Sequence, residues 1–502
     1  MVDFARSTVV YAYLLGSALV FGFVLSACGS QRPGTGHGTA GAAGMGGAPG
    51  MCDALGDLGN ADFCNGSRLK FPLWRTADDF AQRQGTIYDS VRREHCTFGR
   101  AADDKWRCLP QAGASVSDGS YFANAACTDA VAVTGSSAEA VANTLPPYAV
   151  FRLPSPAPAC ETPQWEYREL GAQLRTGETL YSLTGAGCVS TVLGPVERQT
   201  YFRAGRVLPP DLFVAAEEVV VRPPVAARCP LGEVQLRAED GASIRLSLVD
   251  VLSGKRCAPE GMTDGSIRCV PTARYQLSTA ADLCGGPRVA VASACAVGEG
   301  ALVAHRSLTC PHDLRLYQAG PAWSGTECAG GPPPAVIDPT VEVGPELSPD
   351  TFVELAVRHA GTGRLRATQY FEELGAWIPA AEAPIYDSVL EESCTFKAGP
   401  DGQVRCVPPT LFAAFRDAAC TDPVGVAVDI DACVGEPAQK YVGVNGRVYR
   451  RGAELTPSPA QLFSVSTEDS ACRSDPGVVG GTYRHYAVGA EVDLVAATAL
   501  MY

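Results

Sequence analysis

Residues 87–110 read IYDSVRREHCTFGRAADDKWRCLP, and residues 385–408 read IYDSVLEESCTFKAGPDGQVRCVP. Both stretches place an Asp seven positions before a Cys and a second Cys twelve positions after the first, with Arg just before it and Pro two positions after it. A diverged copy from Asp250 to Pro271 keeps all of these spacings. Because self-similarity at fixed spacing marks a repeat architecture, the chain is predicted to contain three related units.

Other features repeat around this pattern. Each unit carries a third cysteine after a short cluster of small residues, and an Arg-Leu pair opens the first and third units. The cysteines are Cys127, Cys284 and Cys420, and the pairs are Arg68-Leu69 and Arg364-Leu365. We therefore place the units at residues 66–222, 230–360 and 361–502.

A further motif predicts that the first two units end in the same way. Residues 205–214 (GRVLPPDLFV) match residues 344–353 (GPELSPDTFV) in Leu, Pro-Asp and Phe-Val. A looser match with an insertion, residues 452–465 (GAELTPSPAQLFSV), occupies the corresponding place in the third unit. We expect one structural element at this place in all three.

The units are predicted to be all-β. Short runs such as Val424–Val428 are rich in β-branched residues, and Asp264-Gly265 and Asp401-Gly402 lie between paired cysteines, where a hairpin needs a turn. Each unit has room for about eight short strands. Two arrangements are compatible with this number: paired blades of a six-bladed β-propeller, or three separate small β domains.

The cysteines predict disulfide bonds. The chain has 20 of them and no CxxC pair, so zinc-ribbon and thioredoxin-like sites are not indicated. Disulfides persist in oxidising compartments, and two cysteines flanking a hairpin can lie on neighbouring strands. The candidates are Cys96, Cys108, Cys127, Cys257, Cys269, Cys284, Cys394, Cys406 and Cys420. Metal binding is the alternative, but His95 beside Cys96 has no counterpart in the other units, so no metal or other cofactor is predicted.

The N-terminus predicts export. After Arg6 an apolar run extends from Val9 to Leu25, and Leu25-Ser26-Ala27-Cys28 resembles the lipobox of bacterial lipoproteins. The resemblance implies a signal peptide at 1–27, diacylglycerol on Cys28, palmitate-type acylation of the new N-terminus, and, with Gly29 next, transfer to the outer membrane. An uncleaved membrane helix is the alternative. Residues 28–65 would then form the lipidated Cys and a Gly/Ala-rich tether, with the folded part periplasmic or extracellular.

Charge and motifs exclude several function classes. The net charge is −14 without a dense basic run, so nucleic acid is not an expected partner. Nucleophile-elbow, zinc-protease, phosphate-loop and calcium-loop motifs are absent from the sequence. Two carboxylates on distant loops would leave no such motif, so an extracellular glycan-acting hydrolase stays an alternative, with Asp103, Asp104 or Glu372 as candidates.

Two sets of residues have both a structural and a binding interpretation. The repeated Asp89, Asp250 and Asp387, with Arg107, Arg268 and Arg405, are interpreted as ion pairs or turn caps rather than a charged site copied three times. The tryptophans are interpreted as core residues rather than sugar-stacking platforms. They are Trp74, Trp106, Trp165, Trp323 and Trp377.

Together, the lipobox, the tether and the repeated C-x11-C, RC[LV]P and AAC patterns resemble the functionally uncharacterised cysteine-rich repeat lipoproteins of myxobacteria. The resemblance implies an envelope location and supplies no activity. The leading hypothesis is a noncatalytic surface protein, anchored to the membrane by lipid, that binds a polysaccharide or a protein through loops of a rigid β scaffold. A purely structural role in the envelope is a third hypothesis.

Overall fold

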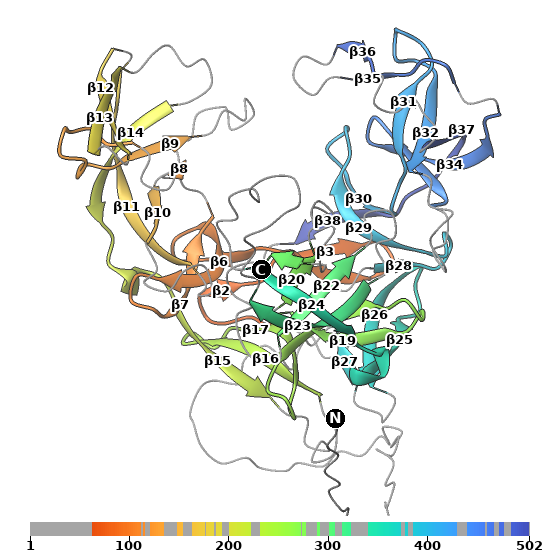
Figure 1. Ribbon diagram of the computed structural model, residues 1–502, viewed down its shortest axis with the longest axis horizontal. Helices are drawn as coiled ribbons and strands as arrows, with labels where there is room; N and C mark the ends of the chain where they lie inside the picture. The colour runs from red at the N-terminus through yellow and green to blue at the C-terminus, as the bar shows by residue number, and fades with distance from the viewer. Residues whose placement is uncertain are drawn as a thin grey trace, which may run out of the picture.

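The regular elements in the described part of the computed structural model are β-strands and two short 3-10 turns, so the chain is all-β as predicted (Figure 1). The described residues are 63–111, 114–115, 121–134, 148–153, 163–175, 177–184, 187–192, 200–221, 231–272, 274–277, 289–291, 301–306, 314–322, 340–372, 377–379, 385–428, 439–456, 459–465, 471–475 and 483–500. Cys28 and the signal and tether segments before residue 63 lie outside them.

Each unit contributes one antiparallel sheet to a central body that we call the hub. In the first unit the strand order is β2–β5–β6–β7. These strands are β2 (Leu69–Lys70), β5 (Ile87–Asp89), β6 (Glu94–Ala101) and β7 (Trp106–Pro110). The chain continues from β2 past Phe71-Pro72 into β3 (Leu73–Thr76), which pairs with β4 (Ala81–Arg83). Pro72 lacks an N–H to donate to a ladder, which accounts for the interruption.

The second and third units repeat this order as β16–β17–β18–β19 and β26–β28–β29–β30. The second set is β16 (Leu231–Ala238), β17 (Ser243–Asp250), β18 (Arg256–Gly261) and β19 (Ile267–Pro271). The third set is β26 (Leu365–Glu372), β28 (Ile385–Asp387), β29 (Glu392–Ala398) and β30 (Val404–Val407), with β27 (Trp377–Pro379) on β26.

Three joining strands connect these sheets into one circuit. β15 (Ala215–Val221) pairs with both β7 and β16, and β25 (Glu354–Ala360) pairs with both β19 and β26. β38 (Ala496–Leu500) pairs with β30 and returns to β3 of the first unit. The described strands therefore form one circuit, hydrogen-bonded from strand to strand except between β2 and β3, where the chain itself makes the link past Phe71-Pro72. The propeller arrangement stays a prediction.

Each unit also carries a second module, inserted between its last hub strand and its joining strand, which we call a satellite. In the first unit the pairing runs β8–β9–β14–β11–β10 and back to β8, a closed five-stranded barrel. Its strands are β8 (Ala114–Ser115), β9 (Val131–Thr134), β10 (Tyr148–Arg152), β11 (Gln164–Gln173) and β14 (Thr200–Val207). The hairpin of β12 (Thr179–Thr184) and β13 (Gly187–Val192) extends it.

The second and third satellites have the same connectivity. β20–β21–β24–β23–β22 close into a barrel, and β31–β32–β37–β34–β33 close through a parallel bridge from Leu411 to Val442. Their strands are β20 (Arg274–Leu277), β21 (Val289–Val291), β22 (Leu302–Arg306), β23 (Leu314–Ala322), β24 (Thr340–Glu346), β31 (Phe412–Phe415), β32 (Pro423–Val428), β33 (Tyr441–Val444), β34 (Arg447–Glu454) and β37 (Tyr483–Glu491), with the hairpin β35 (Phe463–Val465) and β36 (Cys472–Ser474) in the third. Figure 1 shows the first and third satellites on opposite sides of the view, above the hub.

The disulfide prediction is confirmed for the hub hairpins. Cys96–Cys108, Cys257–Cys269 and Cys394–Cys406 each join the two strands of one hairpin, and all six cysteines are buried. A bridge that closes a loop of this size contributes about 3 kcal/mol to stability. Asp264-Gly265 and Asp401-Gly402 form the turns of the second and third hairpins, as expected, with Gly265 and Gly402 at positive φ.

Further bridges fasten the satellites. Cys127 pairs with Cys188 and Cys420 pairs with Cys472, so the third cysteine of the first and third units holds the extra hairpin of its satellite. Cys64, which was not among the candidates, is disulfide-bonded as well. Cys284 lies outside the described residues.

Glycines explain how the two longest strands of each satellite cross closely. A Cβ on Gly205, Gly344 or Gly489 would lie 2.9, 2.7 or 2.9 Å from a carbonyl oxygen of the paired strand. Facing positions are taken by Gly171, Gly320 and Gly452, with the same close approach. Gly452 therefore corresponds to Gly171 and Gly320, so the sequence match of residues 452–465 to residues 205–214 is wrong.

The true counterpart in the third unit is shorter. Cys108 N–H donates to Val214 O, Cys269 N–H to Val353 O, and Cys406 N–H to Val495 O. The valine follows the satellite glycine by nine residues in the first two units (205 to 214, 344 to 353) and by six in the third (489 to 495). The longer connections contain the 3-10 turns Pro210–Leu212 and Pro349–Thr351, which the third connection has no room for.

Candidate functional site

The repeated aspartates are turn caps, and two of them are also buried ion-pair partners. Asp89 accepts hydrogen bonds from the N–H groups of Val91 and Arg92, and Arg68 Nη2 lies 2.6 Å from its Oδ2. Asp387 repeats these contacts with Arg364 in the third unit. The arginine of each opening Arg-Leu pair thus holds the aspartate, a role that only the repetition of Arg68-Leu69 and Arg364-Leu365 could have indicated.

Asp250, the counterpart in the second unit, caps its turn through Leu252 N–H and Ser253 Oγ. The repeated aspartates do not pair with the repeated arginines. Arg107 instead binds Asp103 at 2.7 Å and donates to Phe213 O. These contacts engage each of these residues in a turn cap or an ion pair of its own unit.

Arg268 and Arg405 occupy the same hub position as Arg107. Arg268 donates to Phe352 O and contacts Asp350 at 3.2 Å. Arg405 forms two hydrogen bonds with Asp401, at 2.8 and 2.7 Å. The Arg405 side chain is 28% exposed, compared with 7% for Arg107 and 10% for Arg268.

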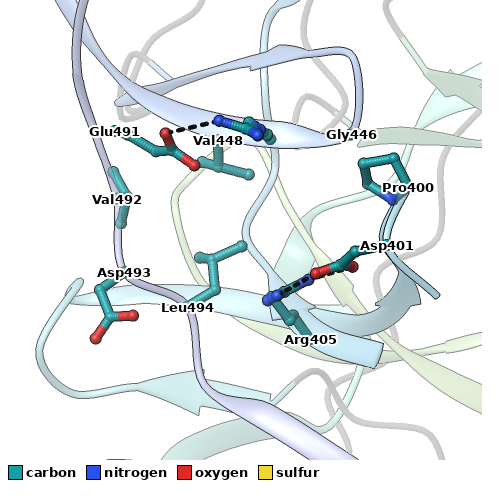
Figure 2. Close-up of a pocket in the computed structure, with 10 residues that line it drawn as sticks. Pro400, Asp401, Arg405, Gly446, Val448, Glu491, Val492, Asp493 and Leu494 are labelled. Atoms are coloured by element: carbon teal, nitrogen blue, oxygen red, sulfur yellow. Dashed lines mark hydrogen bonds and ion pairs between the residues drawn. The ribbon is translucent and has the colours of Figure 1, made fainter. Parts of the chain in front are cut away.

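A cleft of about 310 Å³ opens beside Arg405, where the hub meets the third satellite (Figure 2). It is the candidate functional site. Its lining comes from three segments: the β29–β30 turn, the β33–β34 turn and the connection from β37 to β38. The lining residues are Pro400, Asp401, Arg405, Gly446, Arg447, Val448, Glu491, Val492, Asp493 and Leu494.

The shortened connection explains why the cleft is open. In the first unit the same junction is filled by Phe213, which packs with Tyr167 and Leu109. In the second unit Phe352 packs against a buried cluster that includes Val270. The third unit places the smaller Leu494 here, in the residue before the valine that binds the cysteine N–H. A smaller side chain on a connection three residues shorter leaves space unfilled.

The cleft combines paired charges with an apolar base. Glu491, the last residue of β37, contacts Arg447, the first residue of β34, at 3.4 Å. Asp493 is fully exposed on the rim of the cleft. Figure 2 shows Val448 and Leu494 between these groups and the Asp401–Arg405 pair. With three carboxylates and two guanidinium groups, the formal charge of the lining is −1.

Electrostatics keep Asp401 ionised. Hydrogen bonds from Arg405 and from the Gln403 N–H hold the pKa of this carboxyl well below its usual value. Asp401, and more weakly Asp493 and Glu491, raise the pKa of Arg405. Asp401 can therefore accept hydrogen bonds from a ligand but cannot act as a proton donor at ordinary pH.

The carboxylates named for a hydrolase do not come together in this cleft. Asp103 is bound to Arg107, whose hydrogen bond lowers its pKa, and Asp104 lies in the β6–β7 turn, where Gln164 donates to it. The side chain of Glu372 lies outside the described residues. A glycosidase needs one carboxyl with a raised pKa as its acid, so Asp103, whose pKa is lowered by its hydrogen bond with Arg107, does not fit that role.

The tryptophans lie at packed positions where their side chains are described. Trp165 packs at the first junction, Trp106 against the hub core, and Trp74 is 6.1 Å from Phe396 between ring centroids. Trp323 and the side chain of Trp377 lie outside the described part. Across the described residues, no group of three or more metal-ligating side chains gathers, and no helix has the length and apolarity to span a membrane.

A family model for DUF7481, a family of unknown function, matches residues 50–496. The chain belongs to DUF7481. The match covers the first two units and the third up to residue 496 of this DUF7481 protein, including the residues that line the cleft. No curated protein and no solved structure showed significant similarity to it. The disulfide-bonded β architecture of this family member indicates an oxidising, non-cytoplasmic location.

Proposed function

We propose that this DUF7481 protein is a noncatalytic lipoprotein of the bacterial cell envelope that binds a polysaccharide in the cleft of its third unit. The apolar run from Val9 to Leu25 and the lipobox-like Leu25-Ser26-Ala27-Cys28 support this proposal, with lipid on Cys28 and the folded part outside the cytoplasm, attached to the outer membrane. The disulfide-stapled ring supplies the rigid scaffold, on which a connection between elements supplies the site.

The observation that carries the proposal is the open junction of the third unit. The other two junctions are filled by Phe213 and Phe352, whereas Leu494 leaves a cleft whose volume lies at the lower end of the range for ligand pockets. The same connection thus packs the junction in two units and leaves it open in the third.

The chemistry of the lining favours a hydroxyl-rich, uncharged ligand. Carboxylates accept hydrogen bonds from hydroxyl groups, and guanidinium groups donate to hydroxyl and ring oxygens. An anionic ligand would meet three carboxylates, and both lining arginines are already paired, with Asp401 and Glu491. Val448 and Leu494 offer apolar contacts to the C–H face of a sugar ring. The size of the cleft fits one or two sugar residues rather than a long segment.

A glycan array followed by calorimetry tests this function. The exported protein should bind at least one neutral envelope or capsular glycan, and Arg447→Ala with Glu491→Gln should weaken that binding roughly tenfold, the loss of about 1.4 kcal/mol of contacts. Asp79→Asn, at an equally exposed turn far along the chain, is the matched control and should change nothing. Binding that is absent, or that is equal in both variants, would refute the site.

Two further measurements test the other parts of the proposal. Mass spectrometry of the mature N-terminus should find Cys28 carrying diacylglycerol and an acylated amine, and Cys28→Ser should release the protein from the membrane fraction. Incubation of a bound glycan with the protein should leave its length unchanged. Shortening of the glycan would instead support the hydrolase alternative.

A further inference from the structure

In each unit, the turn that follows the capping aspartate exposes one aliphatic side chain at the same position. These turns connect β5 to β6, β17 to β18 and β28 to β29. Val91, Leu252 and Val389 stand two residues after Asp89, Asp250 and Asp387. They are 70, 86 and 64% exposed, which are the three highest values among the large apolar residues of the described region. Isolated exposed apolar residues are normal on proteins, but three at one repeat position are a pattern.

The turns hold these side chains outward. In each turn, the aspartate accepts a hydrogen bond from the N–H of the aliphatic residue itself, at 3.1, 2.9 and 3.0 Å. The residue that closes each turn has a positive φ, at Arg93, Gly254 and Glu391. Non-glycine residues rarely adopt this conformation, so the turn shape is maintained in two units at some conformational cost.

In the first and third units, the residue after the exposed aliphatic one packs against the rest of the protein, and the aliphatic side chain does not take part in this packing. Arg92 stacks over the rings of Tyr148 and Phe213, at 5.6 and 5.0 Å, and Leu390 is buried beside Tyr441. The turns are thereby fixed against the satellites in the first and third units. We call Val91, Leu252 and Val389 the three tips.

We propose that the three tips contact the lipid surface to which the protein is anchored, inserting into its interfacial layer. This inference rests on the proposed lipid anchoring. The three tips are aliphatic and stand on turns of three different hub sheets, unlike the aromatic and arginine-rich centre that protein partners recognise. A continuous lipid surface, in contrast, can receive several separate apolar side chains at once.

The chain before the hub keeps the tips within reach of lipid. Thirty-four residues separate Cys28 from Phe63, where the chain enters the hub by pairing with β17. Gly-rich chains of that length have an end-to-end distance of about 30 Å. The hub, which carries the tips, is thus the first described part of the chain after Cys28.

The charges beside the tips indicate the type of lipid. Arg93 follows the first tip, Lys255 the second, and Glu391 the third, so the three turns share no common sign. Contact should therefore depend on burial of apolar surface and not on anionic headgroups, and it should vary little with salt.

Vesicle sedimentation tests the proposal with the exported chain from position 28 onward carrying Cys28→Ser, which contains every described residue and has no acyl group. This protein should bind phosphatidylcholine vesicles, and the binding should change less than about twofold between low and high salt. Val91→Ser, Leu252→Ser and Val389→Ser together should weaken it at least tenfold, because each side chain loses its apolar transfer free energy.

The matched control replaces three other exposed apolar residues, with Val189→Ser, Val220→Ser and Phe412→Ser, and should bind as the parent does. Circular dichroism should show both triple variants folded. If the parent does not bind vesicles, if both triple variants lose binding equally, or if the tips are needed only to capture a protein partner, the proposal is overturned. Lipid analysis of Cys28 in the unaltered protein reports separately on the anchor.

Discussion

Arg68 Nη2 lies 2.6 Å from Asp89 Oδ2, and the carboxylate, 1% exposed, is enclosed by the turn it caps. Arg364 and Asp387 reproduce the arrangement at 2.9 Å with a carboxylate that is fully buried. The same arginines donate to carbonyl oxygens of the connections that lead to the joining strands, Leu212 O and Asp493 O. One ion pair therefore ties the start, the turn and the end of a unit together.

Removing one partner of this pair should destabilise the protein strongly. Asp387→Asn leaves Arg364 without its counter-charge in a largely buried position, which should lower the free energy of unfolding by about 3 kcal/mol. Asp250→Asn removes only a turn cap in the second unit and should cost about 1 kcal/mol or less. Urea unfolding compares the two; equal losses would contradict the importance of the pair.

Acid should destabilise the protein through the Asp89 carboxylate. Burial alone would raise the pKa of Asp89, but hydrogen bonds from Arg68 and the Arg92 N–H outweigh burial, so the pKa is lowered below 3.8. A lowered pKa in the folded state stabilises the protein above the unfolded value and loses that contribution as pH falls through the folded one. Unfolding free energy should thus decline below about pH 4, and less steeply in Asp89→Asn. If the unfolding free energy fell equally with pH in the parent protein and in Asp89→Asn, the acid sensitivity would not come from Asp89.

The close strand crossing in the satellites predicts a specific effect of glycine substitution. In Gly489→Ala the new Cβ would lie 2.9 Å from Arg450 O, a backbone atom that cannot move aside, so a loss of about 2 kcal/mol is expected. Gly85→Ala, where nothing lies within 4 Å, should be neutral or slightly stabilising. Thermal unfolding of both variants measures the difference between their losses of stability. Equal stability of the two variants would mean that the two strands can move apart to accept the Cβ.

Closure of the ring depends on the last strand. β38 forms four residue pairs with β3 and two with β30, so a chain ending at Val495 should lose several kcal/mol, at about 1 kcal/mol per hydrogen bond. It would also leave two unpaired strand edges, which favour aggregation. Limited proteolysis and size-exclusion chromatography report both effects, with a chain ending at Leu500 as control. Unchanged behaviour of the shorter chain would mean that the ring is stable when open.

The hub bridges predict a measurable contribution of their own. Cys394→Ala with Cys406→Ala should lower the free energy of unfolding by about 3 kcal/mol, because the reduced hairpin regains conformational freedom in the unfolded state. Cys394→Ser alone should leave a free thiol at Cys406, which is buried and should react with thiol reagents only after unfolding. Thiol titration of the unreduced parent protein should find none of the disulfide-bonded cysteines of the described region reactive.

The sequence by itself determined the local features of this protein. Cysteine spacing, turn dipeptides and repeated aspartates identify the three hairpins, their bridges and their caps, because residues within about 25 positions form each hairpin. The all-β class follows from the same short-range patterns. The match of Gly452 to Gly205 failed because two glycines of similar sequence surroundings occupy facing strands in each satellite.

The tertiary structure alone decided how the units are connected and where the cleft lies. The pairing of β38 with β3 joins residues more than 400 positions apart, and no periodicity records such a partner. The cleft likewise depends on a three-residue shortening whose effect is visible only where hub and satellite meet. The physical reason is that a sequence pattern specifies which surfaces each strand buries, whereas the identity of the neighbour that buries them is set by packing of the whole ring.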